Sequence, residues 1–343
     1  MRRAEVVRPV VGSIVLLLAA MATVGGLAGA APPEAAPTRK VYDEAADGRT
    51  QIDDAVARAQ RENKRVLVQW GGNWCPWCIR LHQLFEQDAD VARTLLYEYE
   101  VVYVDAGRPA GKNVELAKSL GAALDTGGFP YLTVLDGEGK PVANRSTEVL
   151  EVKNDSGASA GVAAGHDPKA VLAFLKANQA RPADAAAVLA QGLANAKTSG
   201  RRVFLHFGAP WCGWCRRLES WIRSPDAAPL FDQEFVDVKI DIDRMTGAGA
   251  VYARFNPAAG RMGIPWFAVL AADGSVLGTS TTAEGANIGF PVDPKEIEHF
   301  ATLLRQSVQH LSSEQQAALI ASLRAAAPKP AARPAADPAG STP

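Results

Sequence analysis

Two short cysteine motifs constrain this chain of 343 residues more than any other feature. The four cysteines occur as the tetrapeptides CPWC (residues 75–78) and CGWC (residues 212–215). A disulfide inside such a tetrapeptide closes a very short loop, so it removes little entropy from the unfolded chain. Each pair is therefore a weak structural staple. It is a suitable centre for disulfide exchange, because the second thiol always lies close to the first.

The sequence around these motifs occurs twice. Residues 64–81 (KRVLVQWGGNWCPWCIRL) align without a gap on residues 201–218 (RRVFLHFGAPWCGWCRRL). Two further matches follow in the same order: GFPY at 128–131 with GIPW at 263–266, and DPK at 167–169 with DPK at 293–295. Three ordered matches indicate a duplicated domain, and their period is far longer than that of a solenoid repeat.

Each copy has the pattern of an α/β domain. Apolar spacing and β-rich runs predict the same order of elements in both copies: a helix (51–63 and 185–196), a strand (66–70 and 203–207), the helix after CxxC (79–85 and 216–222), a second strand (101–105 and 235–242) and a third (131–135 and 266–270). A glycine turn then predicts a hairpin, and Asp-Pro predicts the start of a closing helix. We expect two tandem domains, each with a mixed central sheet flanked by helices.

The ends of the chain have a different composition. Arg2, Arg3 and Arg8 precede a stretch without charge from 9 to 33 that ends in the small-residue triplet AGA at 28–30. These are the parts of a secretory signal. The predicted organisation is a signal peptide (1–30), domains at 41–180 and 181–312, and a C-terminal helix with a Pro/Ala-rich tail (313–343). The protein is expected to be periplasmic or secreted. The alternative to a cleaved signal peptide is an uncleaved membrane anchor at residues 10–30. No other contact with lipid is expected.

Charge and histidine content disfavour other classes of protein. The formal net charge of −1 argues against a nucleic-acid binder, because such domains are usually strongly basic. Five scattered histidines give little material for a metal centre. Two alternatives stay open for the cysteines: one four-thiolate zinc site, or two inert structural disulfides.

The sequence resembles the thioredoxin superfamily over roughly residues 45–310. The resemblance lies in the order of a strand, Trp-Cys-x-x-Cys at the start of a helix, and x-Pro before a hairpin. The local sequence is most similar to exported bacterial thioredoxin-like domains of the thiol:disulfide interchange type. The first cysteines, Cys75 and Cys212, would lie at helix N-termini, where unpaired N–H groups favour the thiolate. They are the expected nucleophiles, and Cys78 and Cys215 would resolve the mixed disulfide.

The resemblance also implies a substrate-binding surface. Pro130 and Pro265 should follow cis peptide bonds, so that the preceding residues, Phe129 and Ile264, turn main-chain groups toward an extended substrate. Four tryptophans next to the cysteines are expected to cover the site or to form an apolar docking surface: Trp74, Trp77, Trp211 and Trp214. The core is the expected place for Trp70.

Both copies depart from the family at one position. Thioredoxins carry a buried Asp six residues before the first cysteine, and here Gln69 and His206 occupy that position. We hypothesise that His206 moves protons for the second site, because histidine titrates near neutral pH. Lys239 falls where the family often has a charged partner, although a solvated strand face is the plainer interpretation. The remaining four histidines are expected at the surface: His82, His166, His299 and His310.

The sequence thus predicts an exported thiol–disulfide oxidoreductase, of the reductase or isomerase type, with no metal and no organic cofactor. Its expected partners are cysteine-containing exported proteins and a membrane or soluble thiol electron donor, with no nucleic acid. One alternative is a redox-sensitive, chaperone-like module that binds clients with little turnover. Another is a relay that passes electrons from one CxxC to the other.

Overall fold

The computed structural model describes residues 40–107, 111–257 and 263–328. The predicted signal peptide and most of the predicted tail lie outside the described residues. Within the described part of the chain, no helix is both long enough and apolar enough to cross a bilayer.

The first repeat contains one four-stranded mixed sheet. Its elements follow the chain in this order: α1 (Gly48–Glu62), β1 (Arg65–Gly71), α2 (Pro76–Gln87), α3 (Ala89–Glu98), β2 (Tyr99–Asp105), α4 (Val114–Ser119), α5 (Leu124–Gly127), β3 (Tyr131–Leu135), β4 (Pro141–Ser146), a 3-10 turn (Thr147–Leu150) and α6 (Pro168–Asn178). The strand order is β2-β1-β3-β4. Strand β2 is parallel to β1, and β3 is antiparallel to both β1 and β4.

The second repeat has the same topology. Its elements are α7 (Ala185–Ser199), β5 (Arg202–Gly208), α8 (Gly213–Ile222), α9 (Ala228–Glu234), β6 (Phe235–Asp241), α10 (Ala248–Phe255), β7 (Trp266–Leu270), β8 (Val276–Thr279), α11 (Pro294–Ser307) and α12 (Ser313–Ala326). The strand order β6-β5-β7-β8 repeats that of the first sheet, with the same strand directions. The predicted fold class is confirmed.

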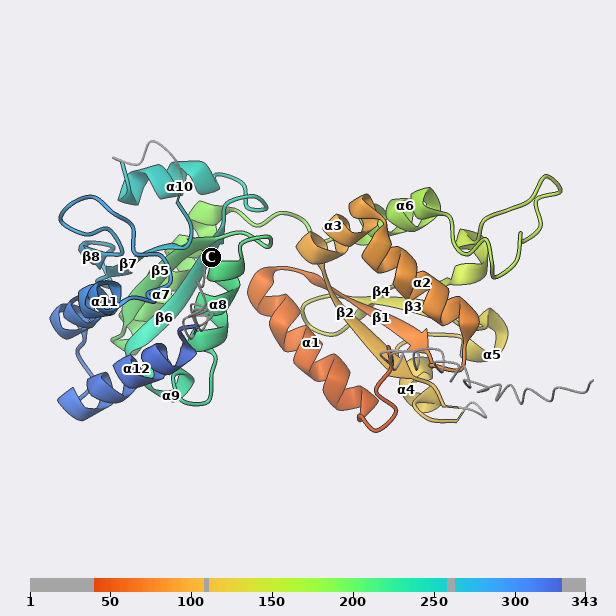
Figure 1. Cartoon of the computed structure of the whole chain (residues 1–343), viewed down its shortest axis with the longest axis horizontal. Coiled ribbons are helices and arrows are strands. Elements are labelled where there is room, and N and C mark those ends of the chain that lie inside the picture. Colours follow the sequence, from red (N-terminus) through yellow and green to blue (C-terminus); the bar gives the residue numbers. More distant parts are fainter. Residues whose placement is uncertain (1–39, 108–110, 258–262, 329–343) are drawn as a thin grey trace, which may run out of the picture. The chain divides into compact units, whose positions relative to one another are not determined.

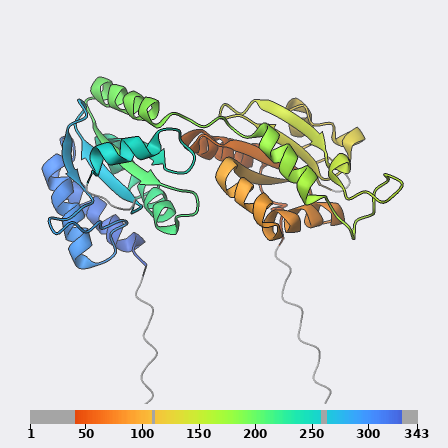
Figure 2. The ribbon, with the colours of Figure 1, turned by 90° about the horizontal axis from the view of Figure 1, so that it is seen from above.

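Helices cover both faces of each sheet (Figures 1 and 2). Side chains alternate along β1, so Val66, Val68 and Trp70 pack in the core under α1, while Leu67 packs against α2, α3 and α6. In β5, Leu205 and Phe207 likewise pack under α7 and α10. Phe204 instead packs on the side of α8, α9, α11 and α12. Gln69 and His206 share a face with Leu67 and Phe204, so both lie toward the CxxC helix.

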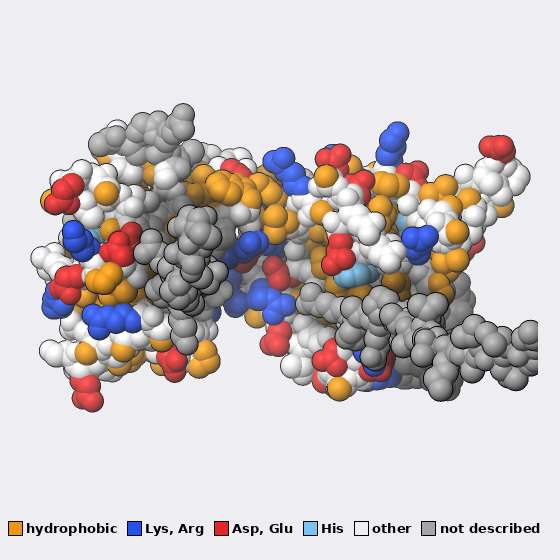
Figure 3. All heavy atoms as spheres, viewed as in Figure 1, with side chains coloured by type: hydrophobic (Ala, Val, Ile, Leu, Met, Phe, Trp, Pro, Cys, Tyr) orange, Lys and Arg blue, Asp and Glu red, His pale blue; other side chains and the backbone are white. Residues whose placement is uncertain are grey.

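The helix ends follow from local sequence. Asp167 and Asp293 are the N-caps of α6 and α11, each followed by proline in the first turn, as the Asp-Pro pairs predict. Ser312 caps α12 through a capping box. Five short helices between strands were not predicted from the sequence: α3, α4, α5, α9 and α10. Charged side chains of both signs are interspersed over the face of the molecule shown in Figure 3.

Candidate active sites

Each CxxC motif lies at the N-terminus of the helix that follows the first strand of its repeat. Cys75 is the N-cap of α2 and Cys212 is the N-cap of α8. The N–H of Cys78 donates to Cys75 Sγ at 3.2 Å, and the N–H of Cys215 donates to Cys212 Sγ at 3.1 Å. Such donors and the helix dipole favour negative charge on the capping sulfur once the disulfide is opened.

The cysteines are bonded within their own pairs. Disulfides join Cys75 to Cys78 and Cys212 to Cys215. The first cysteines are 5% and 4% exposed, and the second are 0% and 1% exposed. The first cysteine of each pair is therefore the more exposed of the two. No group of three or more potential metal-ligating side chains occurs in the described ranges, and the pairing does not support the single four-cysteine zinc site.

A glycine ends the strand beside each disulfide. A Cβ atom at Gly71 would lie 2.5 Å from Cys78 Sγ, and one at Gly208 would lie 3.2 Å from Cys215 Cβ. The strand backbone thus passes directly against the resolving cysteine in both repeats. The sequence did not single out these two positions, although both glycines recur in the aligned block.

The proline loops complete both sites. The Phe129-Pro130 and Ile264-Pro265 peptide bonds are cis, which confirms the expectation. Phe129 packs with the first cysteine pair and makes an edge-to-face contact with Trp74, with ring centroids 5.3 Å apart. Ile264 packs with the second pair. The structure therefore brings together the cysteines, the prolines and the residues before them.

The two sites present their tryptophans differently. Trp211 is 56% exposed and Trp214 is 48% exposed. The Trp214 ring stacks on Phe290, and the Arg217 guanidinium lies over it. Trp74 and Trp77 of the first site are half-buried. The second site thus has an exposed aromatic surface that the first site has partly covered.

His166 provides part of that cover. It is 4% exposed and makes an edge-to-face contact with Trp77, with ring centroids 5.3 Å apart. Neither ring nitrogen has a hydrogen-bond partner among the described residues. Burial lowers the pKa of His166 to about 4. The expectation of a surface histidine was wrong, because the loop before α6 folds back beside α2, where Arg80 donates to the Ala163 carbonyl.

Behind the first disulfide lie a buried amide, two phenols and an imidazole. Gln69 is fully buried, and its Nε2 donates to Tyr42 Oη at 2.6 Å and to the Cys78 carbonyl at 3.1 Å. Tyr103 Oη lies 3.0 Å from His82 Nδ1. Burial raises the pKa of both phenols far above neutral, so they stay protonated. Tyr42 precedes the first helix, and nothing in the sequence pattern links it to the site.

Behind the second disulfide, His206 takes the place of Gln69 and lies beside a carboxylate. His206 is 1% exposed, and its Nε2 lies 3.0 Å from Asp237 Oδ1, at contact distance but without hydrogen-bond geometry. Burial alone would raise the pKa of Asp237, but His206 and the Arg223 guanidinium hold that pKa below its usual value.

Lys239 is another charged group of this cluster. Its Nζ lies 2.8 Å from Glu219 Oε1, and its side chain is 17% exposed. The interpretation of Lys239 as part of a solvated strand face was wrong, because α8 covers this face and supplies Glu219. Burial would lower the pKa of Lys239, but Glu219 and Glu62 raise it, so the ammonium is charged at neutral pH.

Comparisons with known proteins agree with this geometry. A family model described as a thioredoxin-like domain matches residues 52–147, and a second, described as thioredoxin-like, matches residues 184–272. Protein disulfide-isomerase erp38 of Neurospora crassa is 26% identical over 206 residues, covering 58% of this chain and 48% of the relative. Disulfide bond reductase DsbH of Chlamydia pneumoniae is 25% identical over 99 residues, covering 28% of this chain and 60% of the relative.

The chain thus spans about half the length of the first of these relatives and 60% of the second. Among solved structures, a disulphide isomerase from Xylella fastidiosa Temecula1 is 24% identical and covers 40% of this chain and 95% of its own, with a TM-score of 0.33. The sheets, the two CxxC helices and the family models lead to one conclusion: the chain belongs to the thioredoxin superfamily, with two thioredoxin-like domains in tandem.

Proposed function

We propose that this protein is a thiol–disulfide oxidoreductase that exchanges disulfides with cysteine-containing proteins through both CxxC sites. The observation that carries the proposal is the position of each pair. The first sulfur caps a helix and accepts a backbone N–H, while the second is buried one turn later. This arrangement favours a thiolate at the first cysteine and keeps its resolving partner out of reach of other thiols.

The exchange follows from the geometry once a pair is reduced. The thiolate of Cys75 or Cys212 attacks a substrate disulfide, forms a mixed disulfide and releases one substrate thiolate. Cys78 or Cys215 loses its proton and attacks the first sulfur. The internal disulfide forms, and the second substrate thiolate leaves. The substrate disulfide gains two electrons and the CxxC pair loses them, so a thiol donor must reduce the pair again.

Several finer features belong to the same proposal. We assign the two domains to residues 41–180 and 181–312, and we place the protein in the periplasm or outside the cell because of the signal-like residues 1–30. The net direction is reduction or isomerisation, in agreement with the names of the two sequence relatives, a protein disulfide-isomerase and a disulfide bond reductase. The substrate is proposed to lie along Phe129 and Ile264, with Trp74, Trp77, Trp211 and Trp214 as the apolar contact surface.

Insulin reduction with a chemical thiol donor tests this proposal. The double variants C75S/C78S and C212S/C215S are each expected to keep part of the turnover, and the quadruple variant is expected to lose it. A protein that holds unfolded clients but does not turn over would be a binding module. The exposed Trp211 and Trp214 are the observation that favours this second function. Complete loss of turnover in either double variant would instead indicate a relay between the two sites.

A further inference from the structure

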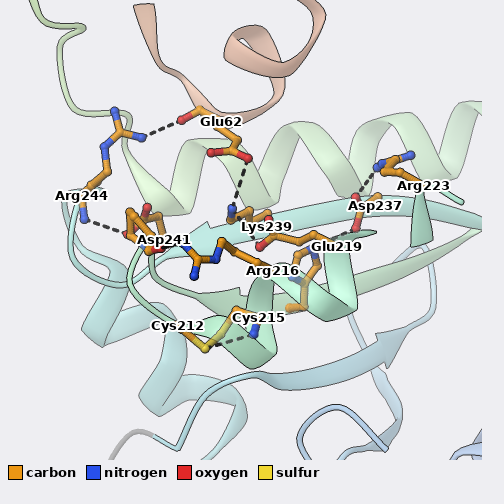
Figure 4. Close-up of polar contacts among 12 residues, drawn as sticks. Glu62, Cys212, Cys215, Arg216, Glu219, Arg223, Asp237, Lys239, Asp241 and Arg244 are labelled. Carbon is orange, nitrogen blue, oxygen red and sulfur yellow. Dashed lines mark hydrogen bonds and ion pairs between the residues drawn. A yellow bond between two sulfur atoms is a disulfide. The ribbon is translucent and has the colours of Figure 1, made fainter. Parts of the chain in front are cut away.

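A half-buried ion pair lies directly behind the second disulfide (Figure 4). Glu219 is on α8, one turn after Cys215, and therefore shares a helix face with it. Lys239 is on β6, where it pairs in register with His206 of β5. Glu219 Oε1 and Lys239 Nζ are 2.8 Å apart, and their side chains are 20% and 17% exposed. The ion pair with Lys239 thus holds the Glu219 carboxylate on the face of α8 that also carries Cys215.

The carboxylate and the resolving sulfur share one small space beside Gly208. The point where a Cβ atom of this glycine would lie is 3.5 Å from Cys215 Sγ and 3.6 Å from Glu219 Oε1. Both atoms therefore lie against the same side of this glycine. Glu219 and Lys239 also line a cavity of about 290 Å³, which gives a proton on the carboxylate a route away from the disulfide.

Resolution of the mixed disulfide needs a base at this place. Cys215 is 1% exposed, and burial disfavours the thiolate of a cysteine. The base must be within hydrogen-bond reach of the thiol, directly or through one water. His206 occupies the position where thioredoxins have their Asp, but its Nε2 contacts Asp237 Oδ1. The CxxC motif follows the C-terminal end of β5. Asp237 pairs with Phe204 of β5 and therefore lies two residues farther from that end than Lys239, which pairs with His206.

We propose that Glu219 is the proton acceptor for Cys215 in the second site and that Lys239 is its positioning residue. The Cys215 S–H bond breaks, and its proton passes to a Glu219 carboxylate oxygen. The Cys215 thiolate attacks Cys212 Sγ, the bond from Cys212 to the substrate breaks, and the substrate leaves as a thiolate. The proton then passes from Glu219 to solvent or to the leaving thiolate. This inference rests on the proposed oxidoreductase function.

Other charged groups lie around the pair, among them Arg58 and Arg61 of α1, which line the same cavity. Glu62 Oε1 of α1 lies 3.9 Å from Lys239 Nζ. Asp241 pairs in register with Gly208, and burial raises its pKa. Its Oδ1 accepts the N–H groups of Asp243 and Arg244, which commits this oxygen to the turn after β6. Arg216 of α8 also borders the cavity. Asp241 is therefore the rival base that an experiment must exclude.

The first site supplies an internal contrast. His82 and Tyr103 occupy the positions of Glu219 and Lys239 and contact each other at 3.0 Å. A Cβ atom at Gly71 would lie 2.6 Å from Tyr42 Oη, so a phenol fills the space beside the sulfur. Asp105 pairs in register with Gly71, as Asp241 does with Gly208. Two carboxylates therefore distinguish the second site from the first: Asp237, which corresponds to Val101, and Glu219, which is the one on the CxxC helix.

The test uses the full chain carrying C75S/C78S, so that the second site alone reacts. The reduced protein is mixed with oxidised glutathione between pH 5 and 9, and quenched samples give the rates of formation and of resolution of the glutathione mixed disulfide. We expect E219Q to slow resolution at pH 7 by about 10²-fold, the low end for a lost general base, and to leave formation unchanged. The deficit should shrink toward pH 9, because the thiol then ionises without a base. K239M is expected to slow the same step by a smaller factor, and D241N is expected to resolve at the parent rate.

Three results would overturn the inference: parental resolution in E219Q at pH 7, an equal loss in formation and resolution, or a D241N defect as large as that of E219Q. If E219Q does not fold, the shorter acid in E219D replaces it, and parental resolution in a folded E219D together with parental resolution in K239M counts against the proposal. A parent protein that forms no mixed disulfide would refute the proposed function itself. That result appears before any Glu219 variant is compared, so the two failures are distinguishable.

Discussion

Alanine at the two strand-end glycines should have very different effects on stability, although the sequence around them is nearly the same. At Gly71, the new Cβ atom would lie 2.5 Å from Cys78 Sγ and 2.6 Å from Tyr42 Oη. Tyr42 is fully buried and Cys78 is held in its disulfide, so neither atom has room to move. Overpacking a core costs about 1–3 kcal/mol, and we expect G71A to lower the free energy of unfolding of the first repeat by about 3 kcal/mol.

The matched substitution G208A meets its nearest atom, Cys215 Cβ, at 3.2 Å and the sulfur at 3.5 Å. A shift of a few tenths of an ångström relieves this contact. Alanine also restricts the unfolded chain, which stabilises by ~0.4–1 kcal/mol. We therefore expect a net change of less than about 1 kcal/mol in the second repeat.

Hydrogen exchange with mass spectrometry at increasing urea measures the two repeats separately, because peptides from β1 and β5 report on different sheets. The expected result is a marked loss of protection in β1 of G71A and near-parental protection in β5 of G208A. Equal losses in both variants, or a loss below about 1 kcal/mol in G71A, would refute this account of the packing behind the disulfides.

Three further predictions concern surface contacts and pH. W214A, at a 48% exposed position, should leave thermal stability nearly unchanged and raise the KM for insulin of the second site by about tenfold, or ~1.4 kcal/mol; an unchanged KM would contradict its role in docking. Burial lowers the pKa of His166 to about 4, so its imidazole stays neutral in the folded protein at pH values where it is protonated in the unfolded chain. The first repeat should therefore lose about 3 kcal/mol of stability as pH falls from about 6.5 to about 4. H166F should flatten that dependence in urea unfolding, and a dependence equal to the parent's would rule out His166 as its source. The pKa of Asp237 is lowered, so its stabilising effect is complete above the usual aspartate pKa and is lost as pH falls below that value. D237N should therefore make the second repeat less stable at pH 7 and its stability less sensitive to acid. An acid transition identical to the parent's would contradict this assignment.

The fold could be predicted because its signals are local. Short β-branched runs gave the strands, Asp-Pro pairs gave the starts of α6 and α11, and Trp70 is fully buried as expected. The site cysteines and the cis prolines follow from motifs of a few residues. The sequence also placed Gln69 and His206 correctly as the residues that differ between the two sites.

The groups behind the disulfides could not be predicted, because they depend on how distant elements pack. Lys239 alternates with apolar neighbours on β6, a pattern that also fits a solvated face. Only the packing of α8 over this face half-buries the lysine and pairs it with Glu219. Tyr42 reaches the first site from the segment before α1. His166 is buried because its loop returns to α2, which no periodicity in the sequence shows.

We propose above all that both CxxC pairs are reversible exchange centres. Equilibration of the protein in glutathione redox buffers, followed by alkylation and mass spectrometry of each pair, measures this directly. We expect both pairs to open and close reversibly, with potentials between roughly −270 mV, as in thioredoxin, and roughly −180 mV, as in protein disulfide isomerase. A pair that stays oxidised below about −300 mV would be a structural disulfide, and potentials near −120 mV would mean that the protein forms disulfides instead of reducing or rearranging them.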